Sequence, residues 1–115
     1  MIMPFDDINA APTEALLQLY ANGDPEASRA LTRRLLPRVL SHAERLLSNR
    51  AEAEDVAQEA MLRLWKIAPD WRQGEAKVTT WLYRVVGNLC TARLRRRRGV
   101  GLDEVPEPVD DQASP

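Results

Sequence analysis

The chain has 115 residues, of which 44% are hydrophobic, 29% charged and 5% aromatic, and its formal net charge is −1. This length and apolar fraction suit one small domain, and they exclude a two-domain enzyme, a collagen-like chain and a wholly disordered one. No apolar run is long enough to cross a bilayer, the N-terminus lacks a secretory signal, and a single cysteine, Cys90, cannot form an internal disulfide. We therefore expect a cytoplasmic protein without membrane insertion.

The near-zero net charge hides a separation of charge along the chain. Residues 1–28 and 99–115 each carry five acidic residues and no Lys or Arg. Residues 77–98 carry seven basic residues and no acidic one. Because physiological salt screens charges over about 8 Å, a polyanion near residues 77–98 would respond to this local positive charge rather than to the net charge.

Apolar residues recur every three or four positions, which predicts helices, and no stretch alternates as a strand would. A first short helix is predicted over residues 13–23, with Thr13 as its N-cap. A second is predicted over residues 25–47, capped by Asp24, and Pro37 is expected to kink or split it. Its predicted buried stripe is Ala27, Leu31, Leu35, Val39, Ala43 and Leu46.

A third helix is predicted over residues 51–67, with Asn49 and Glu52 as a capping pair. A fourth is predicted to begin with Thr79 or Thr80 as its N-cap and to run to about residue 97. The predicted buried positions are Val56, Ala60, Leu64 and Ile67 in the third helix, and Trp81, Leu82, Val85, Leu89 and Ala92 in the fourth.

These elements predict an all-α fold, a compact bundle of about four helices with disordered acidic tails at both ends. The helical domain is predicted over residues 12–98. Residues 1–11 are predicted to be a disordered N-terminus, and residues 99–115 an acidic, proline-containing linker or tail.

The fourth predicted helix carries the strongest candidate binding surface. Its polar and basic residues lie four, three and four positions apart and so share one face, which the arginine run then extends. These candidate DNA-binding residues are Arg84, Asn88, Thr91, Arg95 and Arg96. Arg and Asn can each make two hydrogen bonds to a base, and Arg also pairs with phosphate. The alternative is a solvated face whose basic last turn interacts favourably with the helix dipole.

The loop before this helix offers a second kind of contact. Its candidate residues are Arg72, Gln73, Gly74, Glu75, Ala76 and Lys77. Such a loop can enclose a base that has left the stack, while neighbouring cations hold the phosphates. We expect the nearby Trp71 and Trp81 to be core anchors rather than binding residues.

The third predicted helix carries a polar patch of a different kind. Asp55, Gln58 and Glu59 lie at positions i, i+3 and i+4, and Leu62 extends this face by one turn. A polar patch beside an apolar residue suits a protein partner that supplies Arg or Lys. The alternative is an ordinary solvated helix face.

Catalytic and metal chemistry find little support in the sequence. His42 has no nearby Ser or Cys partner, Cys90 is expected to be a small core residue, and no glycine-rich phosphate loop is present. Asp55 and Glu59 form a carboxylate pair, but nothing near them suggests a metal or substrate site. We therefore assign no enzyme activity, no metal and no cofactor.

Two motifs in order carry a family resemblance. The first is Asp55-Val-Ala-Gln58-Glu59-Ala-Met-Leu-Arg-Leu-Trp65, and about fifteen residues later comes Thr80-Trp-Leu-Tyr-Arg84-Val-Val-Gly-Asn88-Leu with an arginine run after it. Together they resemble the region 2 domain of bacterial sigma factors of the extracytoplasmic-function (ECF) group, over about residues 12–98. The resemblance implies a transcription initiation factor that binds core RNA polymerase, recognises and melts the promoter −10 element, and has an anti-sigma factor as a further partner.

The resemblance also implies roles for particular residues. In this family the Asp-x-x-Gln-Glu helix docks on the coiled coil of the polymerase beta-prime clamp, which implies polymerase contacts for Asp55, Gln58, Glu59 and Leu62. The loop before the Trp-Leu-Tyr-Arg helix captures a flipped base of the −10 non-template strand, which corresponds here to residues 72–77. Arg84, Asn88 and the face that follows them would touch DNA.

The chain departs from the family pattern at two points. Family members often carry an aromatic residue where Val78 stands. Such factors also continue into a region 4 domain that reads the −35 element by helix-turn-helix, whereas this sequence stops at Pro115, so we expect it to be part of a longer factor. Two other functions stay open from the residues alone, a general helical nucleic-acid-binding module and a helical protein-interaction adaptor without DNA binding.

Overall fold

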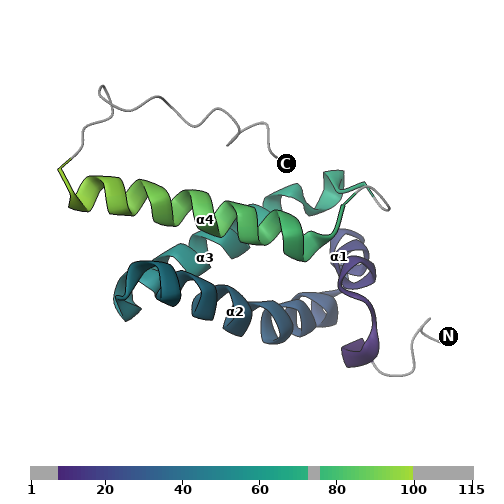
Figure 1. Ribbon diagram of the computed structural model, residues 1–115. Coiled ribbons are helices and arrows are strands. Elements are labelled where there is room, and N and C mark those ends of the chain that lie inside the picture. Colours follow the sequence, from purple (N-terminus) through teal and green to yellow (C-terminus); the bar gives the residue numbers. More distant parts are fainter. Residues whose placement is uncertain (1–7, 73–75, 100–115) are drawn as a thin grey trace, which may run out of the picture.

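The computed structural model describes residues 8–72 and 76–99, and the regular structure in these residues is entirely helical (Figure 1). The elements in chain order are η1 (Ile8–Ala10), α1 (Thr13–Ala21), α2 (Pro25–Leu47), α3 (Arg50–Ile67), η2 (Ala68–Asp70) and α4 (Val78–Arg97). The predicted all-α bundle of four helices is therefore confirmed. None of the helices in the described part of the chain is long and apolar enough to cross a membrane.

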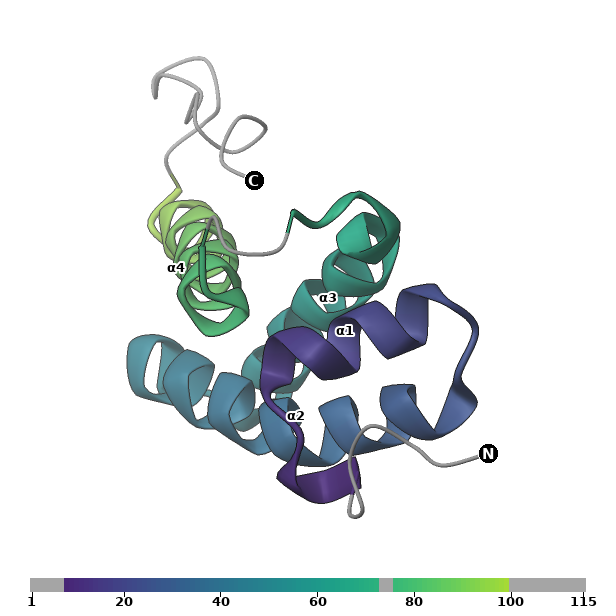
Figure 2. The ribbon, with the colours of Figure 1, turned by 90° about the vertical axis from the view of Figure 1, so that its right-hand side faces the viewer.

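The long helix α2 is the centre of the packing, because α1, α3 and α4 all contact it. Figure 1 shows α4 lying over α2 and α3, with α1 at the end where α4 begins, and Figure 2, which looks nearly along α4, shows that α2 and α3 cross it at an angle. The turn between α2 and α3 lies at the opposite end, under the last turns of α4. Both ends of α4, the predicted nucleic-acid-binding helix, are therefore supported by other elements.

The core between the helices consists of hydrophobic side chains, and no polar or charged residue is buried within the described ranges. The predicted stripe of α2 is correct except at its end, where Leu47 is buried and Leu46 is 42% exposed. The stripe repeats every four residues from Leu31, and Leu47 continues that repeat from Ala43. In α4 the buried face includes Val86 and Cys90, whereas the predicted core positions Leu89 and Ala92 are only half-buried.

Two helix starts agree with the sequence and two do not. Asp24 caps α2 by accepting a hydrogen bond from the Glu26 amide at 2.9 Å, and Asn49 caps α3 by accepting one from the Glu52 amide at 2.9 Å. The predicted caps of α1 and α4 are wrong, because the N-cap residues are Pro12 and Lys77 and neither side chain makes a capping bond. The threonines predicted as caps lie inside the first turns of these helices: Thr13, Thr79 and Thr80.

Helix α2 continues through Pro37, so the expected split does not occur. Pro37 is exposed, while Leu35 and Val39 on either side of it are buried. A proline removes one backbone hydrogen bond, and the tertiary packing of both halves of the helix offsets this loss.

The ordered domain begins earlier than the predicted boundary at residue 12. Residues 8–10 form η1, and Ala11 is buried in the core. The Arg34 guanidinium holds this segment by donating to the carbonyl oxygens of Asn9 at 2.5 Å and Ala11 at 2.6 Å. The remaining residues of the two predicted disordered tails, 1–7 and 100–115, lie outside the described residues.

Candidate functional site

The polar patch of α3 is exposed, as its spacing predicts. Asp55, Gln58 and Glu59 lie on the surface, and Leu62 is 55% exposed, which is unusual for a large apolar side chain. Of the predicted core residues of the same helix, Val56, Ala60 and Leu64 are buried, whereas Ile67 is only half-buried. The helix therefore presents one face to the core and exposes another face, which is partly apolar.

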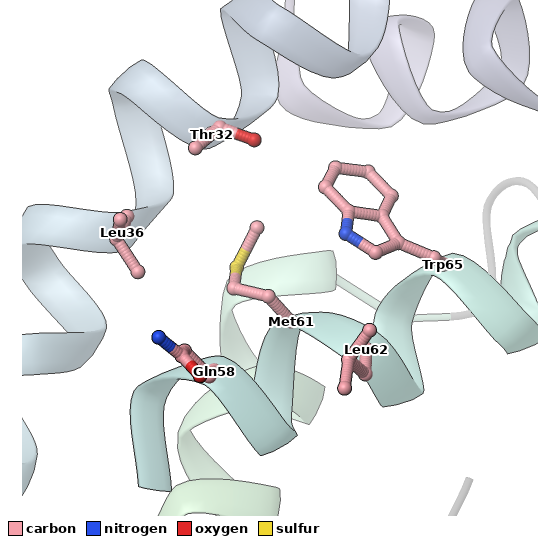
Figure 3. A pocket seen from close by; sticks show the side chains of 6 residues that line it. All are labelled: Thr32, Leu36, Gln58, Met61, Leu62 and Trp65. Atoms are coloured by element: carbon pink, nitrogen blue, oxygen red, sulfur yellow. The ribbon is translucent and has the colours of Figure 1, made fainter. Parts of the chain in front are cut away.

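A pocket lies beside this patch, between α2 and α3 (Figure 3). Its volume is about 280 Å³, and most of its lining is apolar. The residues that line it are Thr32, Leu36, Gln58, Met61, Leu62 and Trp65. Gln58 and Leu62 thus border a hollow that can receive an apolar side chain.

The sequence analysis missed the part of this pocket that α2 contributes. Thr32 and Leu36 lie four residues apart on α2, next to the buried stripe but not in it. The sequence signal for this pocket wall is the i, i+4 spacing of the two residues, which places them on one side of the helix beside the buried stripe. On the other wall Trp65 is half-buried, and its ring lies 4.7 Å from that of Tyr20 on α1, which fixes the indole in place.

Two ion pairs connect the polar patch with its surroundings. Glu59 pairs with Arg63 on the same helix, with 3.3 Å between Oε2 and Nε. Asp55 pairs with Arg93 on α4, with 3.8 Å between Oδ2 and Nη1. The Asp55 side chain is nevertheless 65% exposed, so an additional cation can reach it.

The arginines of α4 fall into two groups. Arg93 and Arg97 face α3 and pair with carboxylates there, Arg97 with Glu52 at 2.9 Å. The predicted DNA-binding arginines Arg84, Arg95 and Arg96 have no carboxylate partner within residues 8–72 and 76–99.

The exposure of the α4 face varies along its length. Arg84, Thr91 and Arg96 are exposed, and Asn88 and Arg95 are half-buried. On the side of α4 that carries the predicted hydrogen-bonding residues, the structure thus leaves a row of positive charge with no carboxylate partner among the described residues. Such a row attracts a polyanion.

The loop predicted to capture a base is described only at its two ends. Arg72, Ala76 and Lys77 are exposed, whereas the predicted residues Gln73, Gly74 and Glu75 lie outside the described residues. Under the loop, the rings of Trp71 and Trp81 meet edge to face at 6.0 Å. Trp81 is buried and Trp71 half-buried, which confirms Trp81 as a core anchor and Trp71 as a partial one.

The start of α4 is fixed by a residue from the opposite end of the chain. The Val78 amide donates a 2.8 Å hydrogen bond to the Glu14 carboxylate on α1, and the Val78 side chain is fully buried. The Val78 side chain therefore fills its core position completely.

The two residues that we considered for catalysis, Cys90 and His42, both pack against other side chains of the domain. Cys90 is buried, and desolvation raises the pKa of its thiol above the usual value. His42 is half-buried with its ring 5.0 Å from that of Tyr83. No group of three or more His, Cys, Asp or Glu side chains in the described part of the chain is arranged to hold a metal ion.

Comparison with known proteins agrees with the motifs. Residues 31–100 match the model of the Sigma-70 region 2 family. The ECF RNA polymerase sigma factor SigM of Mycobacterium tuberculosis is 40% identical over 84 residues, which cover 72% of this chain and 42% of the relative. The ECF RNA polymerase sigma factor SigW of Bacillus subtilis is 34% identical over 76 residues, covering 66% of this chain and 40% of the relative.

A further relative, the RNA polymerase sigma-H factor of Pseudomonas aeruginosa, is 29% identical over 99 residues, covering 84% of this chain and 51% of the relative. No solved structure gives a significant match. The matched part of this chain spans between 40% and 51% of the length of these three relatives. With the two motifs on α3 and α4 and the helical fold, these matches show that the chain belongs to the Sigma-70 region 2 family, as a region 2 domain of the ECF group.

Proposed function

We propose that this domain works in transcription initiation in the cytoplasm, by binding core RNA polymerase and holding the promoter −10 element. The observation that carries the proposal is the division of the surface. One face, on α3, combines carboxylates with an apolar pocket, and another, on α4, carries arginines that have no carboxylate partner among the described residues. The domain makes or breaks no bond in this role.

The polymerase contact is assigned to Asp55, Gln58, Glu59 and Leu62. In this proposal the beta-prime clamp helices supply cations for the carboxylates and an apolar side chain for the pocket beside Leu62. Burial of one such side chain contributes about 1.5–3 kcal/mol, which exceeds the usual contribution of an exposed ion pair. The pocket is therefore the expected energetic centre, and the carboxylates set the orientation. An anti-sigma factor that competes with polymerase would cover the same face.

The DNA contact is assigned to Arg84, Asn88, Thr91, Arg95 and Arg96, with residues 72–77 capturing an unpaired base of the non-template strand. The cations attract any strand by counterion release, and this attraction fades as salt rises. Base selection needs direct hydrogen bonds, which the loop can offer to a base that is out of the stack. The energy of capture offsets part of the few kcal/mol that unstacking costs.

A pull-down with core polymerase tests the first contact. We expect Gln58→Ala/Glu59→Ala to reduce binding strongly, because it removes one wall of the pocket and one carboxylate. Glu54→Ala is the matched control, because Glu54 is exposed on the same helix and pairs with Arg50 as Glu59 pairs with Arg63, but it is not one of the residues assigned to the contact. Equal retention of polymerase by the double variant and the wild type would refute the contact.

Single-stranded DNA binding at low salt tests the second contact. Arg84→Ala should weaken binding to all sequences, whereas Gln73→Ala should mainly reduce the preference for the −10 sequence, by about 1–3 kcal/mol. Equal binding of matched and scrambled strands at every salt concentration would leave only an electrostatic binder. DNA binding without polymerase binding would indicate the general nucleic-acid module, and polymerase binding without DNA binding would indicate the protein adaptor.

A further inference from the structure

An exposed aromatic patch lies where α2 and α4 meet. The Tyr83 ring of α4 packs on the His42 ring of α2, with 5.0 Å between the centroids and 50° between the planes. Tyr83 is 38% exposed, and Leu46, one turn after His42, is 42% exposed. Within the described residues the exposed large hydrophobic side chains are these two and Leu62, so two of the three flank His42. The contact with polymerase proposed above does not account for this patch.

Two arginines flank the same histidine on α2. Arg38 lies one turn before His42 and Arg45 lies three residues after it, and both are exposed. The Arg45 guanidinium contacts Ser41 Oγ at 3.4 Å and His42 Nδ1 at 3.5 Å. Neither arginine has a carboxylate partner in the described ranges, although Glu44 is nearby in sequence and instead pairs with Arg50.

Other arginines on α2 and α3 are held by partners on the molecule, unlike Arg38 and Arg45. Arg29, near the start of α2, pairs with Glu26 at 3.2 Å, and Arg63 on α3 pairs with Glu59 at 3.3 Å. Arg33 and Arg34 of α2 have no carboxylate partner in the described ranges, but they bond the N-terminal segment, Arg33 to Asn9 Oδ1 at 3.0 Å and Arg34 to the carbonyl oxygens of Asn9 and Ala11. Arg38 and Arg45 have neither kind of partner on another part of the described chain, and in this they resemble Arg84 and Arg96 on α4.

The patch is continuous with the proposed DNA face of α4. Tyr83, which contacts His42, directly precedes Arg84 in the sequence. Around the axis of α4, Gly87 lies between Tyr83 and the side that carries Arg84 and Thr91. A Cβ added at Gly87 would meet no atom within 4 Å, so nothing interrupts the surface there. A strand that lies along Arg84 can thus cross Tyr83 onto α2.

From these observations we infer that Arg38, His42, Arg45 and Tyr83 form a second contact for single-stranded nucleic acid, which extends the binding surface from α4 to α2. A base stacks on the exposed part of the Tyr83 ring, and the two arginines hold the phosphates on either side. Cations interleaved with aromatic rings are the usual means of binding single strands without sequence preference. This inference rests on the proposed function only in that the same strand contacts α4.

The test measures affinity for a single strand of about 16 nucleotides as a function of salt, with Arg38→Gln as the main variant. Loss of one phosphate contact should lower the slope of log K against log salt by about 0.7. Arg29→Gln is the matched control, because it makes the same charge change on the same helix, about 20 Å from His42 along the axis. We expect its slope to equal that of the wild type.

A second pair of variants tests the stacking. Tyr83→Leu should weaken binding of the same strand about fivefold or more, whereas Tyr83→Phe, which keeps the ring, should bind like the wild type. Circular dichroism melting verifies that each variant is folded, and the exposed Arg38 keeps the test decisive if Tyr83→Leu is unstable.

The outcomes separate this inference from the proposed function. If Arg38→Gln and Arg29→Gln have the same slope, the contact on α2 is refuted, and a weakening by Arg84→Ala still supports the contact on α4. If Arg84→Ala has no effect while Arg38→Gln lowers the slope, the contact on α4 fails and the contact on α2 stands.

Discussion

At the scale of single residues, the arginine run at the end of α4 contains side chains with opposite roles. Arg97 donates from Nη2 to the Leu47 carbonyl oxygen at 3.0 Å and pairs with Glu52 at 2.9 Å. It therefore ties α4 to the turn between α2 and α3. Arg96 is exposed, and no such contact holds it to the described part of the molecule.

We predict that Arg97→Ala lowers the free energy of unfolding by about 1–2 kcal/mol, because it removes a charged hydrogen bond and an ion pair. Arg96→Ala should leave stability unchanged and weaken DNA binding. Urea denaturation and DNA titration of both variants measure the two effects. Equal stability of the two variants would contradict the structural role of Arg97.

The buried thiol of Cys90 is expected to make the free energy of unfolding fall at high pH. Burial raises the pKa of the folded-state thiol, so the unfolded chain loses this proton more easily. The contribution of Cys90 to stability is therefore complete below the pKa of the thiol in the unfolded chain and is lost as the pH rises through the higher pKa of the folded state. We predict that the free energy of unfolding falls less between pH 8 and 10 in Cys90→Ala than in the wild type. Parallel curves in urea denaturation would contradict this.

At the scale of elements, α4 begins at a cap that comes from another helix. The Glu14 carboxylate of α1 accepts the Val78 amide at 2.8 Å, at the positive end of the α4 dipole. This bond fixes the helix start next to the loop that we propose as the site of base capture.

We predict that Glu14→Ala destabilises the domain by about 1–2 kcal/mol, as loss of a helix cap does. Glu14→Gln should cost less, because the amide oxygen can still accept the bond although the charge is gone. Thermal or urea denaturation of the two variants measures the difference. Wild-type stability of Glu14→Ala would show that the cap is dispensable.

The success of the sequence prediction depends on how local each interaction is. The caps of α2 and α3 join residues two and three positions apart, so Asp24 and Asn49 were identifiable from the sequence. The cap of α4 joins residues 64 positions apart, and no local pattern indicates it.

The core and the candidate site follow the same rule. The buried face of α4 is broader than a single stripe because α4 contacts both α2 and α3, and only the fold specifies this. On α3, the exposed residues follow from helical spacing, so Asp55 and Gln58 were placed correctly. The pocket wall supplied by Thr32 and Leu36 depends on how α2 packs against α3, and spacing within one helix does not determine that.

At the scale of the whole molecule, an ion pair joins the helices that carry the two proposed surfaces. Asp55 belongs to the proposed polymerase contact on α3 and Arg93 lies on α4, which carries the proposed DNA contact, and their side chains are 3.8 Å apart. A polymerase cation that approaches Asp55 must compete with Arg93 for the carboxylate and is also repelled by its charge. In the free domain Arg93 therefore partly occupies a carboxylate that we propose as a polymerase contact.

We predict that Arg93→Gln raises the affinity for core polymerase by up to about fivefold, the equivalent of the 0.2–1 kcal/mol that an exposed ion pair contributes. Arg96→Gln is the control, because it removes the same charge from the same helix without releasing a carboxylate. In an Asp55→Asn background Arg93→Gln should have no further effect, since a double-mutant cycle isolates the energy that two contacting residues share. Titration of core polymerase with the four proteins of this cycle measures that energy. If Arg93→Gln and Arg96→Gln change the affinity equally, or if the gain persists without the Asp55 carboxylate, the two surfaces act independently and the ion pair has no part in polymerase binding.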